Sequence, residues 1–82
     1  MSKFVDLTSG MAADVIPVTP SDSIDIDAFV VGLYVTTGGD ISIETQGGTR
    51  TITVPDNFTL TCIVKRVNVT NTTATGIHAY VI

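Results

Sequence analysis

The sequence predicts an all-β domain, a small antiparallel β-sandwich or barrel of about six to seven strands, behind an N-terminal arm. Three observations indicate this fold class: apolar and polar residues alternate with the period of two typical of strands, Gly- and Pro-containing turns separate the segments, and no long helical period occurs. A chain of 82 residues holds one domain with a thin core. We assign residues 1–14 to the arm and residues 15–82 to the β domain.

The arm contains apolar residues that have no place in the strand count. Phe4, Val5 and Leu7 lie in a segment without clear strand alternation, which is typical of an extended segment that docks on another surface. A short helical turn around SGMAAD, with Ser9 as its cap, is the alternative.

The first two strands are VIPVT, residues 15–19, and AFVVGLYV, residues 28–35. The first is expected at a sheet edge, because Pro17 lacks the backbone N–H of a ladder hydrogen bond. The second is the most apolar segment and is expected at the centre of the sheet, with both faces covered. One face is expected to carry Phe29, Val31, Leu33 and Val35, and the other Val30 and Tyr34.

Between these strands, the stretch VTPSDSIDI is expected to form a shaped corner. Pro20 presets the first angle of the turn, and Ser21 and Asp22 can hydrogen-bond to the turn's backbone. The stretch lacks the glycine and the further spaced oxygens of a calcium loop, so we assign no metal to its two aspartates, Asp22 and Asp25, or to Asp27, which follows it. Alternation places Ile24 and Ile26 inward and Asp25 and Asp27 outward.

Two middle segments, ISIET at residues 41–45 and TRTITV at residues 49–54, are expected to pair as a hairpin around the turn QGG. The stretch TTGGD, residues 36–40, is also expected to be a hairpin turn, and it is too short to cradle phosphate. Alternation places Ile41, Ile43, Ile52 and Val54 inward and Ser42, Glu44, Thr51 and Thr53 outward.

The longest strand signal is FTLTCIVKRVNV, residues 58–69. Its apolar phase slips by one residue at Lys65–Arg66, which indicates either a β-bulge or a strand that bends from one sheet into another. Its inward residues are expected to be Phe58, Leu60, Cys62, Val64, Val67 and Val69. A Thr-rich loop, TNTTATG, then leads to the last strand, GIHAYVI. That strand is expected to point Ile77, Ala79 and Val81 inward and His78, Tyr80 and Ile82 outward.

Composition argues against several classes of function. The net charge of −4 and the four basic residues argue against a nucleic-acid partner. AFVVGLYV is too short to span a membrane and the N-terminus lacks the apolar core of a signal peptide, so we expect no membrane partner. Cys62 is the single cysteine and is expected to be a buried thiol, and His78 has no second histidine for a metal site. No catalytic motif occurs, so we expect neither an enzyme nor a cofactor.

The residues favour self-association. The central and last strands are apolar on both faces, whereas a domain this small has only one interior, so a second interface would bury the surplus. The expected interface residues are Phe4, Val5, Leu7, Val30, Tyr34, His78, Tyr80 and Ile82.

The order and spacing of three segments resemble the head spike base proteins of tailed phages and gene transfer agents. The matching segments are VTPSDS at residues 18–23, LYVTTGGD at residues 33–40 and VKRVNVTNTTATGIHA at residues 64–79. Asn71 replaces a glycine of the family pattern, and the turn is expected to be retained because asparagine tolerates the left-handed backbone conformation.

The resemblance implies a virion structural protein: a β-rich homo-oligomer, a pentamer or alternatively a trimer, located on the capsid surface at a vertex. It implies that the major capsid protein anchors this oligomer and that the oligomer carries a spike or fibre protein, with the arm as the docking segment. Two alternatives stay open, a cement or decoration protein spread over the capsid lattice and a receptor- or glycan-binding module. Against the latter stands the aromatic content of 6% without tryptophan.

Overall fold

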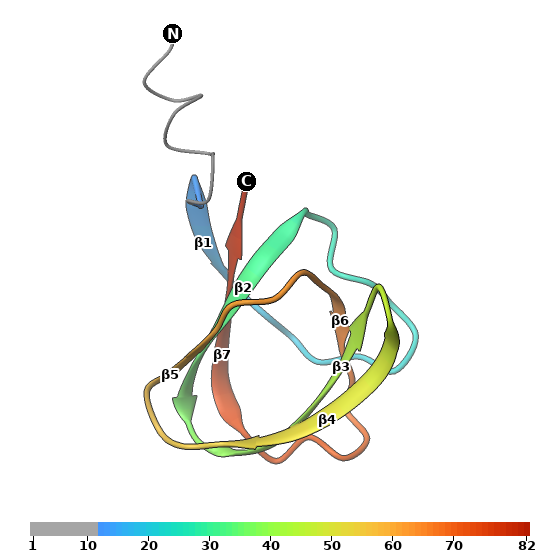
Figure 1. Cartoon of the computed structure of the whole chain (residues 1–82), viewed down its shortest axis with the longest axis vertical. Coiled ribbons are helices and arrows are strands. Elements are labelled where there is room, and N and C mark those ends of the chain that lie inside the picture. The colour runs from blue at the N-terminus through green and yellow to red at the C-terminus, as the bar shows by residue number, and fades with distance from the viewer. Residues whose placement is uncertain (1–11) are drawn as a thin grey trace, which may run out of the picture.

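The computed structural model describes residues 12–82, which form one antiparallel sheet of seven strands and no helix (Figure 1). The expectations for Phe4, Val5 and Leu7 lie outside the described residues. The strands are β1 Asp14–Pro17, β2 Val30–Thr37, β3 Gly39–Thr45, β4 Gly48–Val54, β5 Phe58–Leu60, β6 Val64–Val67 and β7 Thr75–Val81. Within these residues no helix is long and apolar enough to cross a membrane. The expected small all-β fold is confirmed.

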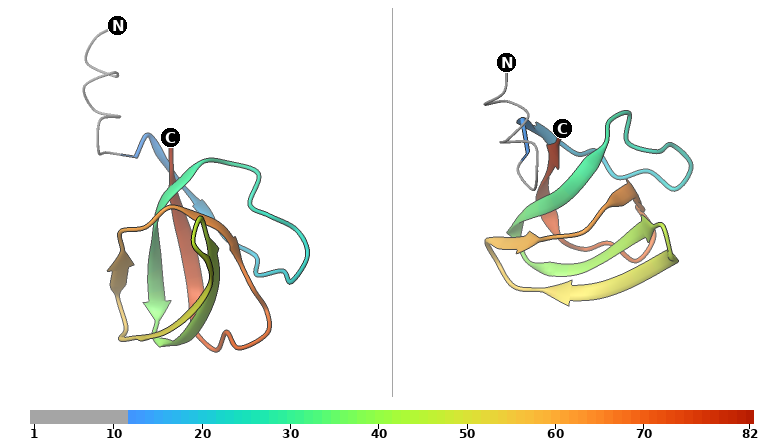
Figure 2. Two further views of the ribbon diagram at one scale, coloured as in Figure 1. Left: turned by 45° about the vertical axis from the view of Figure 1, so that its right-hand side comes forward. Right: turned by 45° about the horizontal axis from the view of Figure 1, so that its top comes forward.

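The sheet is strongly curved and open. Its strand order is β1-β7-β2-β6-β3-β4, with β5 also paired to β2, and the two outermost strands of this order do not pair with each other. Figures 1 and 2 show β3 and β4 folded across from β2 and β7, so that the concave side encloses the core. The buried apolar residues of this core are Val30, Leu33, Val35, Ile41, Ile43, Val54, Val64, Val67, Ala74, Ile77, Ala79 and Val81.

The segment 58–69 explains how a single sheet can fold over itself. Its first part, β5, pairs with β2. Its second part, β6, pairs with β3, and its ladder to β2 consists of the pair of Val64 with Val30 alone. The predicted phase slip is a β-bulge, because Arg66 pairs with Glu44 and Val64 with Thr45, which leaves Lys65 without a partner on β3. The bulge keeps both valines of β6 in the core.

The expected inward position of Val69 is wrong. Strand β6 ends at Val67, and Val69 is 55% exposed. The chain turns here into the Thr-rich loop, in which Asn71 has the left-handed φ of 66° expected for its glycine-like position. Cys62 is half-buried and packs against the core.

A second bulge corrects the predicted faces of the central strand β2. Val30 pairs with Val81 and Gly32 pairs with Tyr80, so Val31 is the extra residue. The expectation that Val30 shares a face with Tyr34 is therefore wrong: Val30 is 1% exposed and belongs to the core. Phe29, expected to share a face with Leu33 and Val35, is 53% exposed, whereas those two residues are fully buried.

The predicted hairpin of β3 and β4 is confirmed, with Ile41 opposite Ile52 in the register. The stretch TTGGD is not a hairpin turn, because β6 lies between β2 and β3. Ser42, expected to point to solvent, is buried. The loop after β6 covers it: the Asn68 side chain donates to Ser42 Oγ at 3.1 Å, and the Ser42 N–H donates to Thr72 Oγ1 at 2.9 Å.

The corner formed by VTPSDSIDI braces the same loop. The Ser21 hydroxyl oxygen accepts hydrogen bonds from the N–H groups of Ser23 and Ile24, as expected for a hydroxyl-stabilised turn. The Asp22 carboxylate reaches across to residues 69 and 70, where it accepts three hydrogen bonds. Ile24 is 72% exposed, so its predicted inward position is wrong; Ile26 packs against the core as predicted.

Candidate assembly surface

The convex side of β1, β7 and β2 forms an apolar surface, which we call the outer face. The strand registers fix its members, because residues that pair across an antiparallel sheet lie on the same face. Tyr80 of β7 pairs with Val15 of β1 and with Gly32 of β2. His78 pairs with Pro17 on one side and with Tyr34 on the other. Ile82 follows on the same face of the last strand and is 51% exposed.

The Tyr80 ring packs next to Gly32 on the outer face. The Cδ2 atom of Tyr80 is 3.5 Å from the point that a Cβ atom on Gly32 would occupy, and the carbonyl oxygen of Leu60 is only 2.9 Å from it. A larger residue at Gly32 would collide with backbone, so the ring rather than a β2 side chain covers this position. Val15, on the other side of the ring, is 49% exposed.

Two polar side chains of the outer face, Tyr34 and His78, have polar partners within the chain. The Tyr34 hydroxyl donates to Asn57 Oδ1 at 3.0 Å, and His78 Nδ1 lies 3.4 Å from the Gly76 carbonyl oxygen. The strand positions on this face carry no Asp, Glu, Lys or Arg. A partly exposed, uncharged surface with two tyrosines has the composition that is typical of the centre of a protein interface.

The structure brings together four of the residues that the sequence assigned to an interface: Tyr34, His78, Tyr80 and Ile82. Val30 does not belong to this set, because the bulge in β2 turns its side chain into the core. Val15 and Pro17 belong to the outer face but were not predicted to do so. Their alternation in VIPVT places Val15 and Pro17 on one face of the strand. Which face this is follows only from the pairing of β1 with β7.

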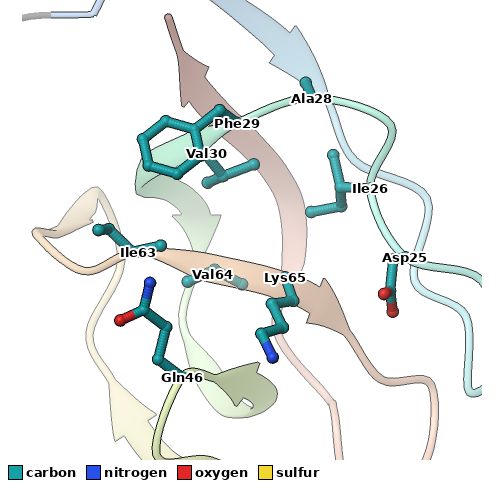
Figure 3. A pocket seen from close by; sticks show the side chains of 9 residues that line it. All are labelled: Asp25, Ile26, Ala28, Phe29, Val30, Gln46, Ile63, Val64 and Lys65. Carbon is teal, nitrogen blue, oxygen red and sulfur yellow. The ribbon is translucent and has the colours of Figure 1, made fainter.

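A second apolar feature lies where β2 and β6 begin. It is a hollow of about 220 Å³, lined by Asp25, Ile26, Ala28, Phe29, Val30, Gln46, Ile63, Val64 and Lys65. In Figure 3, Phe29 and Ile63 stand on one side of the hollow and Ile26 on the other, with Lys65 and Gln46 at its lower rim. Phe29 and Ile63 are both exposed.

Two carboxylates, Asp22 and Glu44, accept hydrogen bonds from the loop that follows β6. The pKa of Asp22 is lowered chiefly by the hydrogen bonds from the Thr70 N–H and hydroxyl, with a smaller contribution from the Val69 N–H. The pKa of Glu44 is lowered first by the Thr49 hydroxyl and then by the Asn68 amide and the Arg66 charge. These acidic residues therefore act as hydrogen-bond acceptors. Within residues 12–82, no group of three or more His, Cys, Asp or Glu side chains could hold a metal ion.

Comparison with known proteins gives one structural match. No family model matches the chain, and no curated protein does. A chain solved in the capsid of a native gene transfer agent (GTA) particle, computed with C5 symmetry, is 36% identical to this chain and superimposes with a TM-score of 0.75. The match covers 83% of this chain and 82% of that chain. With this identity over most of both lengths, the chain belongs to the same family as this protein of the gene transfer agent capsid.

Proposed function

We propose that the chain is a non-enzymatic structural protein of a phage-like or gene transfer agent capsid, and that it forms the base of a head spike or fibre at a capsid vertex. The match to a chain of a GTA capsid, at 36% identity and over 83% of this chain, is the observation that carries the proposal. The segments that resemble head spike base proteins, residues 18–23, 33–40 and 64–79, fall within the described fold.

The proposed assembly is a homo-oligomer, a pentamer, held together through the outer face. The resemblance of residues 18–23, 33–40 and 64–79 to head spike base proteins implies a pentamer, and identical subunits close into a ring through one repeated contact. The outer face supplies a surface suited to subunit contact, because Tyr34, Tyr80 and Ile82 are not fully covered within one chain. A trimer is the alternative assembly.

Two partners follow from this role. The major capsid protein would anchor the oligomer on the capsid surface, with residues 1–14 as the docking segment, and a spike or fibre protein would sit above it. The protein would accordingly be found in the virion. No nucleic acid, membrane, metal or cofactor takes part in this function.

Native mass spectrometry tests the oligomer, with the full chain and with residues 1–14 removed. We expect a species of about 43 kDa, five times the chain mass of 8.6 kDa, in both proteins, because the contacts lie on the strands. Monomers in both proteins would contradict the outer face as the self-association surface. A pentamer that is lost on truncation would place the contacts in the arm instead.

A cement protein over the capsid lattice is the second candidate, because the match is to a capsid chain and does not specify a vertex. The two roles differ in copy number per particle, which quantification against the major capsid protein measures. A receptor- or glycan-binding module is a weaker alternative. A sugar platform would have to use the tyrosine side chains, and the hydroxyl of one of them, Tyr34, already hydrogen-bonds to Asn57.

A further inference from the structure

The two ends of the domain differ in chemistry. One end, which we call the Phe29 end, contains the starts of β1 and β2, the end of β7 and the turn between β3 and β4 (Figures 1 and 2). Backbone hydrogen bonds tie its segments together: the Ala13 N–H donates to the Val81 carbonyl oxygen at 2.8 Å, and the Ile82 N–H donates to the Phe29 carbonyl oxygen at 3.2 Å.

Exposed apolar side chains gather at the Phe29 end. Phe29, Ile82 and Ile63, the last 39% exposed, account for half of the exposed large hydrophobic residues of the described chain. The 220 Å³ hollow lies between Phe29 and Ile63 on one side and the residue 25–28 segment on the other (Figure 3). Lys65 lines its rim and makes no ion pair of 4.0 Å or less with residues 12–82.

The opposite end, which we call the Asn57 end, is polar. It consists of residues 38–39, 55–57 and 71–75, and none of the exposed large hydrophobic residues of the described chain lies there. Its polar groups bond to one another: the Gly38 N–H donates to Asp56 Oδ1 at 2.6 Å and the Asp40 N–H donates to Thr73 Oγ1 at 2.9 Å. This end therefore suits contact with water rather than a dry interface.

We propose that the Phe29 end faces the capsid shell and that its hollow receives an apolar side chain of the major capsid protein. The inference rests on the proposed capsid role and deepens it, because it assigns the orientation of the domain. The hollow has an apolar floor and two charged residues in its lining: Asp25 pairs with Arg66 at 3.2 Å, whereas Lys65 makes no ion pair within residues 12–82. The hollow therefore fits a segment in which an apolar side chain stands next to a carboxylate, which would pair with Lys65.

The position of the N-terminal segment supports the same orientation. Residues 1–11 join the described fold at Ala12, beside the C-terminus and at the Phe29 end. Eleven residues span at most about 40 Å when extended. Phe4, Val5 and Leu7 can therefore continue the apolar contact along the shell from the hollow, whereas the Asn57 end stays free for the spike or fibre.

Photo-crosslinking in intact particles tests the orientation. Phe29 is replaced by p-benzoylphenylalanine in one full-length protein and Thr73, at the Asn57 end, in another. We expect crosslinks from position 29 to the major capsid protein and none from position 73. Capsid crosslinks from position 73 alone, or crosslinks from position 29 only to other copies of this chain, would overturn the proposal.

Two matched variants give an independent readout. Phe29→Ser with Ile63→Ser removes the apolar rim, whereas Ile24→Ser removes an apolar side chain that is 72% exposed and does not line the hollow. We expect the double variant to keep its oligomer in native mass spectrometry but to load onto particles at least about tenfold less, and the control to load normally. Equal loading of both variants would refute the hollow as a docking site. Absence of the unmodified protein from particles would instead refute the capsid role itself.

Discussion

Tyr80→Ser is the substitution that most directly perturbs the proposed contact between subunits. The Tyr80 ring lies at the centre of the outer face, between Val15 on β1 and Gly32 on β2. It is half-buried in the single chain, so part of the ring remains available to a second subunit. Truncation of a central interface aromatic residue costs about 2 kcal/mol of binding free energy, which raises the dissociation constant of each contact about 30-fold.

The same substitution weakens the fold only partly. The ring covers Gly32, so its loss exposes some backbone and lowers the free energy of unfolding by about 1–2 kcal/mol. A domain of this length has a total free energy of unfolding of about 4–12 kcal/mol. We therefore expect the variant to remain a folded domain whose assembly requires a much higher protein concentration.

Sedimentation velocity over a concentration series measures the assembly, and circular dichroism with thermal melting confirms the fold. Ile24→Ser is the matched control, because Ile24 is an exposed apolar residue on the corner loop and not on the outer face. A folded Tyr80→Ser protein that assembles at the same concentration as the unmodified chain would refute the outer face as the subunit contact.

Three further predictions concern the fold itself. Leu33→Ala removes a side chain that is 0% exposed, and chemical denaturation should show a loss of about 2–5 kcal/mol; a loss below 1 kcal/mol would contradict the assigned core. Gly76 has a φ of +65°, and Gly76→Ala would place a Cβ atom 2.7 Å from the Thr36 Cβ, so the melting temperature of the variant should fall. An unchanged melting temperature would contradict this backbone conformation. The pKa of Asp22 is lowered by its hydrogen bonds from Thr70, so its stabilising effect is present above the ordinary value of 3.8 and is lost as the pH falls through the lowered value. Asp22→Asn should therefore melt at a lower temperature at pH 6 and lose less on acidification than the unmodified chain; parallel curves of melting temperature against pH for the two proteins would argue against this role.

Alternation of apolar and polar residues predicted most strands and inward faces, and it failed where both faces of a strand are apolar. The bulge at Lys65 was visible in the sequence because charged residues interrupt the apolar phase there. The bulge at Val31 was not, because no polar residue interrupts the run from Val30 to Val35 apart from Tyr34, and a period of two cannot locate the slip there. The face of Val30 was therefore predicted wrongly.

Long-range pairing was the other limit. No local pattern in the sequence indicates that β6 lies between β2 and β3. The hairpin turn predicted at TTGGD is therefore wrong. Ser42 alternates like a solvent-facing residue, but the loop that carries Asn68 and Thr72 covers it from far along the chain. The members of the outer face were easier to predict, because His78 and Tyr80 lie on β7, whose alternation is regular, and Ile82 directly follows this strand.

The copy number of this chain in purified particles, measured against the major capsid protein by quantitative mass spectrometry, tests the vertex role most directly. A protein at the base of a vertex spike should be present in a small, fixed number, five copies at each occupied vertex, because a homo-pentamer matches the fivefold axis there. Amounts close to those of the major capsid protein would contradict the vertex location and would assign the chain to the capsid lattice as a cement protein.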